Sequence, residues 1–414
     1  MMWFSKRFRA LLLASALVAG ACAGGGPGLE LAREGVLPRP IMVEEASAAR
    51  RRVNLEVFDA VWRAVDRAYY DARLHGLDWD AVRREHRPRA EQATSEAELY
   101  AALNQMLALL DDNHTNVTSP STRARDEVIR VEGAVASYGL QLQRHGEVWM
   151  VEQVYPNSPA EAAGVLVGWR IVSVDGAPFG RHVLAADGRE DQVVFEDEDG
   201  RRIEKVLRGA LLTPPPRREA RVLPDGGLYL RFARFDQSSL VWVHQAINLR
   251  DEPPAYLVLD LRHNGGGLLS VLGRVAGLIS AEQSTPYAVL HGRLFNQRLM
   301  TASGQGGYRG PLYILIGPGS ASASELLAAW AQETDRGLVV GQPSHGSVIA
   351  SQDFNLPDGG ELSLSIRDIR TGRGVRLEKV GVTPDLVIAP TLAQRRAGED
   401  PVLQTVIARA TGGG

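Results

Sequence analysis

The chain has 414 residues, and its 46 lysines and arginines against 49 aspartates and glutamates give a formal net charge of −3 at pH 7. This length predicts several domains, and the near-neutral charge argues against a nucleic-acid-binding surface and a nucleic-acid partner. A single cysteine, Cys22, excludes an intrachain disulfide. Only three lysines occur, Lys6, Lys205 and Lys379, so few residues could serve as a catalytic lysine.

Residues 1–21 have the pattern of an export signal of the lipoprotein type. A basic start is followed by the apolar run 11–18, which is too short to span a bilayer. The run leads into Ala19-Gly20-Ala21-Cys22, which resembles a bacterial lipobox. In that resemblance Cys22 is lipidated, becomes the first mature residue and anchors the protein to a membrane. Ala19 stands where lipoboxes usually carry leucine, so an ordinary cleaved signal is the alternative.

The glycine-rich residues 22–44 predict a flexible leash, and residues 45–128 predict a helical region. Apolar side chains recur there at helical spacing, beginning with Phe58, Val61, Trp62, Val65 and Tyr69. A later helix is expected to begin at Ser95, because Ser95 and Glu98 have the spacing of a capping box. The helices are expected to end at residues 111–115, which contain His114.

Short strands and turns are expected over residues 129–213, and two motifs there resemble a PDZ domain. They are Ser158-Pro159-Ala160-Glu161-Ala162-Ala163-Gly164 and the run 168–176, in which Trp169 replaces the usual aspartate. PDZ domains bind peptide C-termini by strand addition, and loop amides hold the terminal carboxylate. The resemblance implies that Tyr138, Gly139 and Leu140 form this carboxylate loop.

Three consecutive prolines, 214–216, predict a stiff linker before a second type of fold. Buried-type strands and helices alternate over residues 214–395, which implies parallel strands with helical crossovers. Residues 396–414 are expected to be a C-terminal tail. The chain as a whole is therefore expected to be a multidomain α/β protein with an N-terminal helical region and a β-rich PDZ-like domain.

One segment of this last region has the pattern of a catalytic turn. Gly319-Ser320-Ala321-Ser322-Ala323-Ser324-Glu325 lies between an apolar run, 312–317, and a helical one, 326–330. A strand that turns sharply into a helix places a serine at the helix N-terminus, where free N–H groups favour negative charge. Acyl-transfer enzymes need such a field for the oxyanion of the tetrahedral intermediate. Taken alone, a serine-rich helix cap is the simpler interpretation.

Three motifs in combination support the catalytic interpretation. Asp260-Leu261-Arg262-His263-Asn264-Gly265-Gly266-Gly267, the serine-rich turn and the Gly381-Val382-Thr383-Pro384-Asp385 motif together resemble the C-terminal processing (tail-specific) proteases and the related tricorn core. The resemblance covers most of the mature chain and implies a tail-specific protease core of the crotonase-like type. It implies a serine-type peptidase with Ser322 as nucleophile. It also implies an oxyanion hole formed by Ala323 with Gly266, or with Gly265 as the next choice.

The expected general base differs from that of the best-known members of this family. Their Ser-Lys dyad takes the lysine from G-x-x-T-x-G-K, and here Ser347 stands at the lysine position. The tricorn-like branch uses a Ser-His-Glu arrangement instead, which implies His114 as base and Glu378 as the carboxylate that orients it. His345 is the rival base, because it lies two residues from the lost lysine. Lys379 could pair with Glu378 and compete for it.

The expected function is that of an exported serine endopeptidase that hydrolyses peptide bonds of polypeptides, with cleavage near C-termini as the implied specificity. No cofactor is implied, and no H-E-x-x-H motif or cysteine–histidine cluster suggests a metal. The expected location is the periplasm or a lipid-anchored position in a bacterial cell envelope. The alternative is an inactive peptide-binding scaffold, since the usual lysine is lost. Asp260, Arg262 and Asn264 are expected to brace the glycine turn, and His263 to be structural or substrate-facing.

Overall fold

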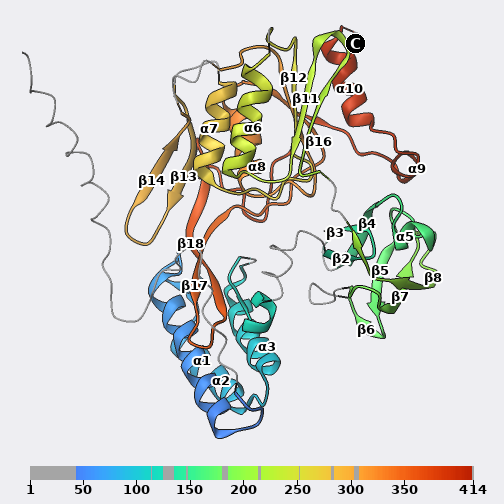
Figure 1. Ribbon diagram of the computed structural model, residues 1–414. Coiled ribbons are helices and arrows are strands. Elements are labelled where there is room, and N and C mark those ends of the chain that lie inside the picture. The colour runs from blue at the N-terminus through green and yellow to red at the C-terminus, as the bar shows by residue number, and fades with distance from the viewer. Residues whose placement is uncertain are drawn as a thin grey trace, which may run out of the picture.

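The structure is a computed structural model that describes residues 43–112, 114–124, 135–145, 148–179, 185–212, 216–250, 252–280, 284–302 and 307–412. The expected signal segment, Cys22 and all but the last two residues of the expected leash lie outside this range. No helix in the described ranges is long and apolar enough to cross a membrane. Figure 1 shows a helical region, a small β-rich domain and a larger α/β core.

In the described part of the helical region, the helices α1 (Ala48–Ala68), α2 (Trp79–Gln92) and α3 (Glu96–Leu107) pack their apolar faces together. The short helices η1 (Leu74–Gly76) and η2 (Ala108–Leu110) belong to the same region. Ser95 caps α3 as expected, because its hydroxyl accepts the Glu98 N–H. The Glu98 carboxylate accepts from the Thr94 N–H instead of completing the capping box at Ser95.

A long hairpin from the core completes this helical region. Strands β17 (Ile349–Asn355) and β18 (Glu361–Thr371) extend down into it (Figure 1), and Leu362 and Leu364 are buried in the same apolar cluster as Phe58. Strand β1 (Asn116–Thr118), which follows His114, pairs antiparallel with β18. The helical region and the core are therefore joined through a shared sheet.

The β-rich domain has a sheet of order β3-β4-β5-β7-β8, with β6 paired to β5, and a separate β2-β9 pair. The elements are β2 (Val135–Ser137), β3 (Leu140–His145), β4 (Val148–Val154), α5 (Pro159–Ala162), β5 (Arg170–Val174), β6 (Ala177–Pro178), β7 (Glu190–Glu196), β8 (Arg202–Arg208) and β9 (Ala210–Leu212). Strand β3 forms one edge of the sheet. Trp169, which replaces the usual aspartate, is buried against Phe195 and so serves the core of the domain.

The core contains a six-stranded sheet of order β10-β11-β12-β15-β16-β19, parallel except for β10. Its strands are β10 (Arg218–Val222), β11 (Leu228–Phe232), β12 (Leu257–Asp260), β15 (Leu312–Ile316), β16 (Leu338–Gly341) and β19 (Leu386–Val387). The helices are α6 (Gln237–Asn248), α7 (Leu269–Ile279), α8 (Ala323–Glu333), α9 (Leu392–Arg396) and α10 (Pro401–Ala410), with η3 (Pro224–Gly226). A second sheet joins β13 (Pro286–His291) and β14 (Asn296–Met300) to β18. The expected alternation of parallel strands with helices is present.

The C-terminal residues 396–414 are not the simple tail that we expected. Helix α10 buries Val402, Leu403 and Val406 against the face of the sheet opposite α6, α7 and α8. The Asp400 side chain accepts the Leu403 N–H and caps the helix, and Pro401 occupies its first position. The C-terminal segment is therefore part of the core.

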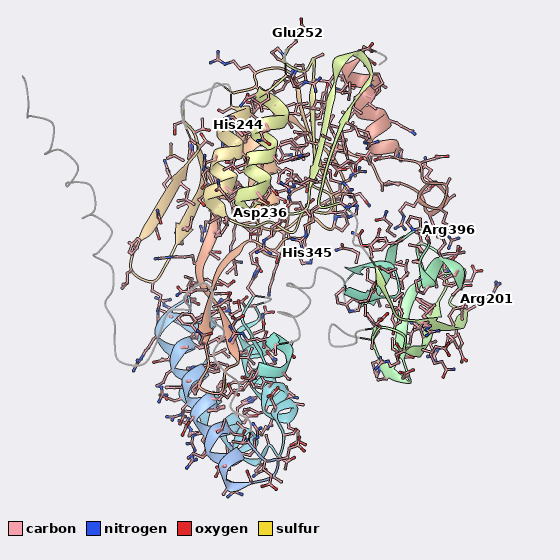
Figure 2. All side chains as sticks on the ribbon, in the orientation of Figure 1. Arg201, Asp236, His244, Glu252, His345 and Arg396 are labelled. Atoms are coloured by element: carbon pink, nitrogen blue, oxygen red, sulfur yellow. The ribbon has the colours of Figure 1, made fainter. Side chains whose placement is uncertain are left out.

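Helix α9 fastens the β-rich domain to the core. Arg395 pairs with Glu152 at 3.0 Å, and Arg396 makes two hydrogen bonds to the Glu198 carboxylate, of 2.7 and 2.9 Å. Figure 2 shows Arg396 beside this domain. The carboxylates come from the β-rich domain and both arginines from the core, so these contacts link the two parts by charge.

Candidate active site

Ser322 occupies a sharp turn between a buried strand and a buried helix. Strand β15 ends at Ile316, α8 begins at Ala323, and Ser322 itself has φ 56° and ψ −115°. A residue with a side chain adopts a positive φ only at a cost of about 1 kcal/mol or more, so surrounding contacts must hold it. Such strained turns are common at catalytic nucleophiles.

The three serines of the turn have different surroundings. Ser320 is fully buried and donates to the Leu261 carbonyl at 2.7 Å, and Ser324 is fully buried and donates to the Asn264 carbonyl at 2.8 Å. Both tie the turn to the glycine-rich loop after β12. Ser322 is half-buried, which leaves it as the most accessible serine of the three.

Glu325 holds the turn from inside. Its fully buried carboxylate accepts hydrogen bonds from the Ser322 and Ser347 N–H groups, both at 2.9 Å, and from the Ser344 hydroxyl and the Gly346 N–H, at 2.6 and 2.7 Å. A buried carboxylate is stable only when such donors compensate its lost hydration. The position of Glu325 three residues after Ser322, at the start of a helix, was the signal for this inward role.

Two backbone amides close to Ser322 are open. Within the described part of the chain, neither the Ala323 N–H nor the Gly265 N–H has a hydrogen-bond partner. The Gly266 N–H donates to the Asn264 side-chain oxygen at 2.9 Å, so this geometry favours Gly265 over our first choice, Gly266. Gly266 keeps space at the site instead, because a Cβ on it would lie 2.6 Å from the Ser322 Cβ.

The glycine-rich loop is braced as expected. Asn264 donates to the Phe232 carbonyl at 2.9 Å, and Asp260 binds the Arg262 guanidinium and the Tyr229 hydroxyl. Burial alone would raise the pKa of Asp260, but the Arg262 charge and these hydrogen bonds outweigh it and lower the pKa to about 2. Arg262 also contacts both oxygens of Asp400, at 2.9 and 2.7 Å. The cap of α10 thus supports the same loop, a contact that sequence spacing alone did not suggest.

His114 lies beside Ser347, the residue at the lysine position of the sequence motif. The His114 Nε2 atom is 2.9 Å from the Ser347 hydroxyl, and the Ser347 carbonyl accepts the Ser322 N–H at 2.9 Å. The imidazole is 20% exposed, so it is accessible but not freely solvated. Its ring therefore sits beside Ser347, which is in direct backbone contact with Ser322.

Glu378 lies behind the same nitrogen. Its Oε2 atom is 3.8 Å from His114 Nε2 and accepts the Val348 N–H at 2.7 Å, and the side chain is only 1% exposed. Burial raises the pKa of Glu378, although the Val348 N–H and the nearby His114 oppose this shift. Lys379 does not pair with Glu378. The carboxylate therefore faces the imidazole.

The loop that carries His114 is fixed by Asp112 and Lys379. Asp112 accepts the His114 N–H at 2.7 Å and the Thr115 hydroxyl at 2.8 Å, and Thr115 in turn accepts the Ser365 N–H of β18. Lys379 pairs with Asp111 at 2.5 Å on the surface. This pair connects the His114 loop with the Glu378 loop, and the residue pattern gave no sign of it.

The other two histidines near the site have different surroundings. His345 is exposed and donates its backbone N–H to the Ser320 carbonyl; no side-chain hydrogen bond to it occurs among the described residues. Figure 2 places His345 at the edge of the core that faces the other two parts. His263 Nδ1 lies 3.2 Å from the Gln141 side chain on strand β3. The site is therefore next to the edge of the β-rich domain.

The expected carboxylate loop of that domain is compact. Tyr138 is buried and donates its hydroxyl to Asp191 at 2.6 Å, and the Gly139 N–H donates to the Ser137 hydroxyl at 3.0 Å. Gly139 has φ 81° and leaves no room for a Cβ beside Ser158. Leu140 begins the edge strand β3. Tyr138 therefore acts through the packing of the loop, and its side chain does not face outward.

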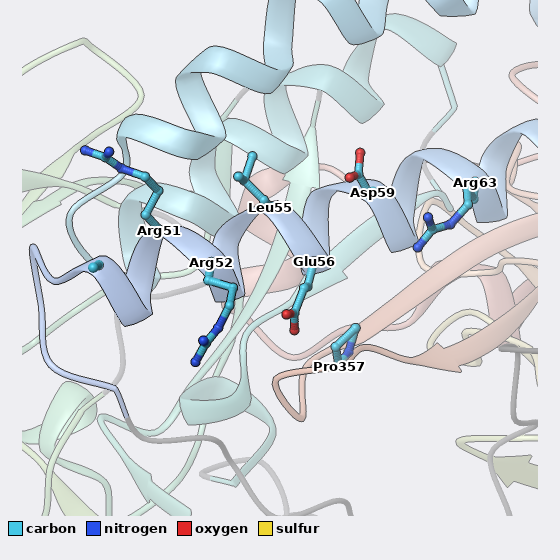
Figure 3. A pocket seen from close by; sticks show the side chains of 8 residues that line it. Arg51, Arg52, Leu55, Glu56, Asp59, Arg63 and Pro357 are labelled. Carbon is cyan, nitrogen blue, oxygen red and sulfur yellow. The ribbon is translucent and has the colours of Figure 1, made fainter.

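One open hollow, of about 570 Å³, lies elsewhere, on α1 of the helical region (Figure 3). Arg51, Arg52, Glu56 and Arg63 on α1 line it, together with Pro357 from the tip of the β17–β18 hairpin. None of these residues belongs to the site around Ser322. In the described ranges no group of three or more histidines, cysteines, aspartates or glutamates is arranged to hold a metal ion.

Known protein families match each of the three parts of the fold. Residues 227–388 match peptidase family S41, residues 52–108 match the tricorn protease C1 domain, and residues 150–187 match the PDZ domain. The matched S41 segment contains Ser322, Glu378 and the glycine-rich loop. It ends before helix α10.

The similar proteins cover most of the chain. A carboxyl-terminal-processing protease of Picosynechococcus sp. is 30% identical over 341 residues, which are 79% of this chain and 81% of that protein. The chloroplastic C-terminal processing peptidase of Tetradesmus obliquus is 28% identical and covers 81% of this chain and 77% of its own length. Among solved structures, the photosystem II D1 C-terminal processing protease superposes with a TM-score of 0.66 at 26% identity, and covers 81% of this chain and 93% of that one.

The fold, the serine turn and these relatives lead to one identification. The predicted helical region, PDZ domain and α/β core are confirmed, as is the predicted family. The chain belongs to the carboxyl-terminal-processing protease family, within peptidase family S41, and is a serine-type peptidase with a PDZ domain.

Proposed function

We propose that the protein hydrolyses peptide bonds by a Ser322-His114-Glu378 triad in place of a Ser-Lys dyad. The observation that carries this proposal is the position of His114, whose Nε2 atom lies 2.9 Å from the hydroxyl at the usual lysine position. The buried Glu378 carboxylate, 3.8 Å from that nitrogen, favours the imidazolium that forms when the base takes a proton.

The reaction follows from these positions. Ser322 Oγ attacks the scissile carbonyl carbon while its proton passes to His114. The carbonyl oxygen takes up the negative charge, which the Ala323 and Gly265 N–H groups stabilise at the N-terminus of α8. His114 then gives the proton to the leaving amine. Water, activated by the same imidazole, releases the new C-terminus from Ser322.

The substrates are polypeptides, and we place the cleavage near their C-termini. The names of the similar proteins and the presence of a PDZ domain support this assignment. Strand β3 would pair with the substrate terminus, and the loop of Tyr138, Gly139 and Leu140 would receive its carboxylate. Gln143 of β3 donates to the Pro318 carbonyl just before the serine turn, so this edge adjoins the site.

We further propose that the protein is exported and lipid-anchored through Cys22 in a bacterial cell envelope. This proposal rests on the basic start, the short apolar run and the small residues before Cys22. Labelling with a fatty-acid analogue should modify the wild type and not Cys22→Ser. Equal labelling of both would refute the anchor and leave the catalytic proposal intact.

A fluorophosphonate probe, which labels only activated serines, tests the triad. The wild type should react, Ser322→Ala should not, and His114→Ala should react much more slowly. His345→Ala is the matched control and should react like the wild type. Normal labelling of His114→Ala with loss in His345→Ala would transfer the role to His345. No labelling of the wild type, with or without a peptide that engages the PDZ domain, would refute the triad.

A further inference from the structure

The hydroxyl of Ser347 has no role in the triad as proposed above, yet it is the group in closest contact with the base. Its Oγ atom is 2.9 Å from His114 Nε2, whereas the Glu378 carboxylate is 3.8 Å from the same nitrogen. Ser347 is therefore one of the residues that hold His114 in place.

The backbone of Ser347 is held rigidly on the nucleophile side. Its carbonyl accepts the Ser322 N–H, and its N–H donates to Glu325, the same buried carboxylate that accepts the Ser322 N–H. A side chain on such a backbone has few rotamers to lose when it holds another group. Ser347 thus connects the nucleophile turn and the base, and the described residues include no other side chain that hydrogen-bonds the His114 ring.

The side chain at position 347 is short, where the family motif carries a lysine. A lysine at 347 would reach toward Ser322 by itself, whereas a serine leaves space, which the His114 ring fills from the helical region. The remaining hydroxyl is in place to orient that ring. It can accept the N–H of His114 Nε2, so that the lone pair of the neutral ring lies at Nδ1.

We propose that Ser347 is a positioning residue for catalysis: its hydroxyl oxygen accepts the His114 Nε2–H, fixes this tautomer of the neutral imidazole and leaves the Nδ1 lone pair free to take the Ser322 proton. This inference rests on the proposed function of His114 as the base. The charged groups around the ring are Glu378, Asp112 and the Lys379–Asp111 pair, with Arg376 acting on Glu378. Among these contacts, the Ser347 hydroxyl oxygen and the Glu378 carboxylate both lie at Nε2 and favour a proton on this nitrogen.

The test compares two variants that differ by one hydroxyl. Ser347→Thr keeps the hydroxyl, and Ser347→Val has nearly the shape of threonine without it. We expect kcat/KM with a peptide substrate to fall about tenfold in the valine variant, mostly in kcat, and to stay within about threefold of the wild type in the threonine variant. Ser351→Ala, an exposed serine on β17 with no side-chain hydrogen bond in the described chain, is the matched control and should not change activity.

The pH profile separates positioning from a general loss of structure. Loss of the hydroxyl removes an acceptor that favours the imidazolium, so the acid limb of kcat/KM should move to lower pH by about half a unit to one unit. A change in packing alone would lower activity without moving this limb. Equal activity of the valine and threonine variants, or an unmoved limb, would overturn the inference.

A double-mutant cycle distinguishes this failure from failure of the triad. If Ser347 acts through His114, Ser347→Val should add no further loss in a His114→Ala background. An inactive His114→Ala together with a fully active Ser347→Val would refute the role of Ser347 alone. A fully active His114→Ala would refute the triad, and the inference with it.

Discussion

Ser322 and His114, which exchange a proton in the proposed mechanism, are held in opposite ways. The Ser322 turn is fixed inside the core by buried hydrogen bonds: Glu325 accepts the Ser322 N–H, and Ser320 and Ser324 donate to carbonyls of the glycine-rich loop. His114 comes from the helical region, is partly exposed, and is held at the site by the pairing of β1 with β18 and by contacts of its loop with the core. The nucleophile therefore depends on local packing, and the base depends on the assembly of distant segments.

The largest effect should come from the base itself. His114→Ala should reduce kcat/KM by about 10³- to 10⁴-fold, because loss of one member of such a unit nearly abolishes the chemistry. Its melting temperature should stay close to that of the wild type, since the ring is partly exposed. If His114→Ala instead lowered the melting temperature so far that the protein was unfolded in the assay, the loss of activity would reflect a role of His114 in folding.

Glu325→Gln should affect both stability and activity, unlike His114→Ala. The amide cannot accept at its nitrogen, so two of the four donors at Glu325 lose their partner, at a cost of about 1–3 kcal/mol each. A displaced Ser322 should lower kcat by about a hundredfold. Urea unfolding and kcat measured on the same sample test this. Unchanged stability would mean that the turn does not need the carboxylate.

Glu378→Gln should lower activity while it raises stability at neutral pH. The lost attraction to the imidazolium should cost about ten- to a hundredfold in kcat/KM. Burial raises the folded pKa of Glu378 above its unfolded value, so its contribution to stability is present at low pH and is lost as pH rises through the folded pKa. Urea unfolding from pH 4 to 8 should therefore show the variant gaining on the wild type as pH increases. The reverse slope would contradict the raised pKa.

The smallest effect should follow from the surface pair. Lys379→Met removes the partner of Asp111, which is 84% exposed, so kcat/KM should fall only about two- to fivefold. Added salt should weaken the wild type toward the variant, because it screens an exposed pair. Salt titration of kcat/KM measures this. A loss as large as that of Glu378→Gln would mean that the pair, and not the shared sheet, holds the His114 loop.

The parts of the site that sequence could predict are those with a local cause. The strand, small residues and helix around Ser322 follow one another in the chain, and the helical spacing of Phe58 and its neighbours is visible without a structure. The contact of His114 with Ser347 depends on the pairing of β1 with β18, which joins segments more than two hundred residues apart and has no local pattern. The choice between Gly265 and Gly266 for the oxyanion hole also depends on geometry, because only the structure shows that the Gly266 N–H donates to Asn264.

Helix α10 was not predicted from the sequence, for a different reason. Its cap at Asp400, its Pro401 and its apolar spacing are all present in the sequence, but the segment lies beyond the last recognisable motif. The contact of Asp400 with Arg262 could not be inferred, since either residue has a closer partner in sequence. Helix signals in a sequence thus predict structure outside the motifs of a family as well as inside them.

In the proposed mechanism, the site is complete only after β1 has paired with β18. In a chain made from its N-terminus, residue 114 emerges first, Ser322 much later and Glu378 last, and β18 lies between the two catalytic residues of the core. A partly synthesised or partly folded chain therefore contains an incomplete site and cannot cut its own unfolded segments. Peptide-bond cleavage by the proposed triad thus requires the completed fold.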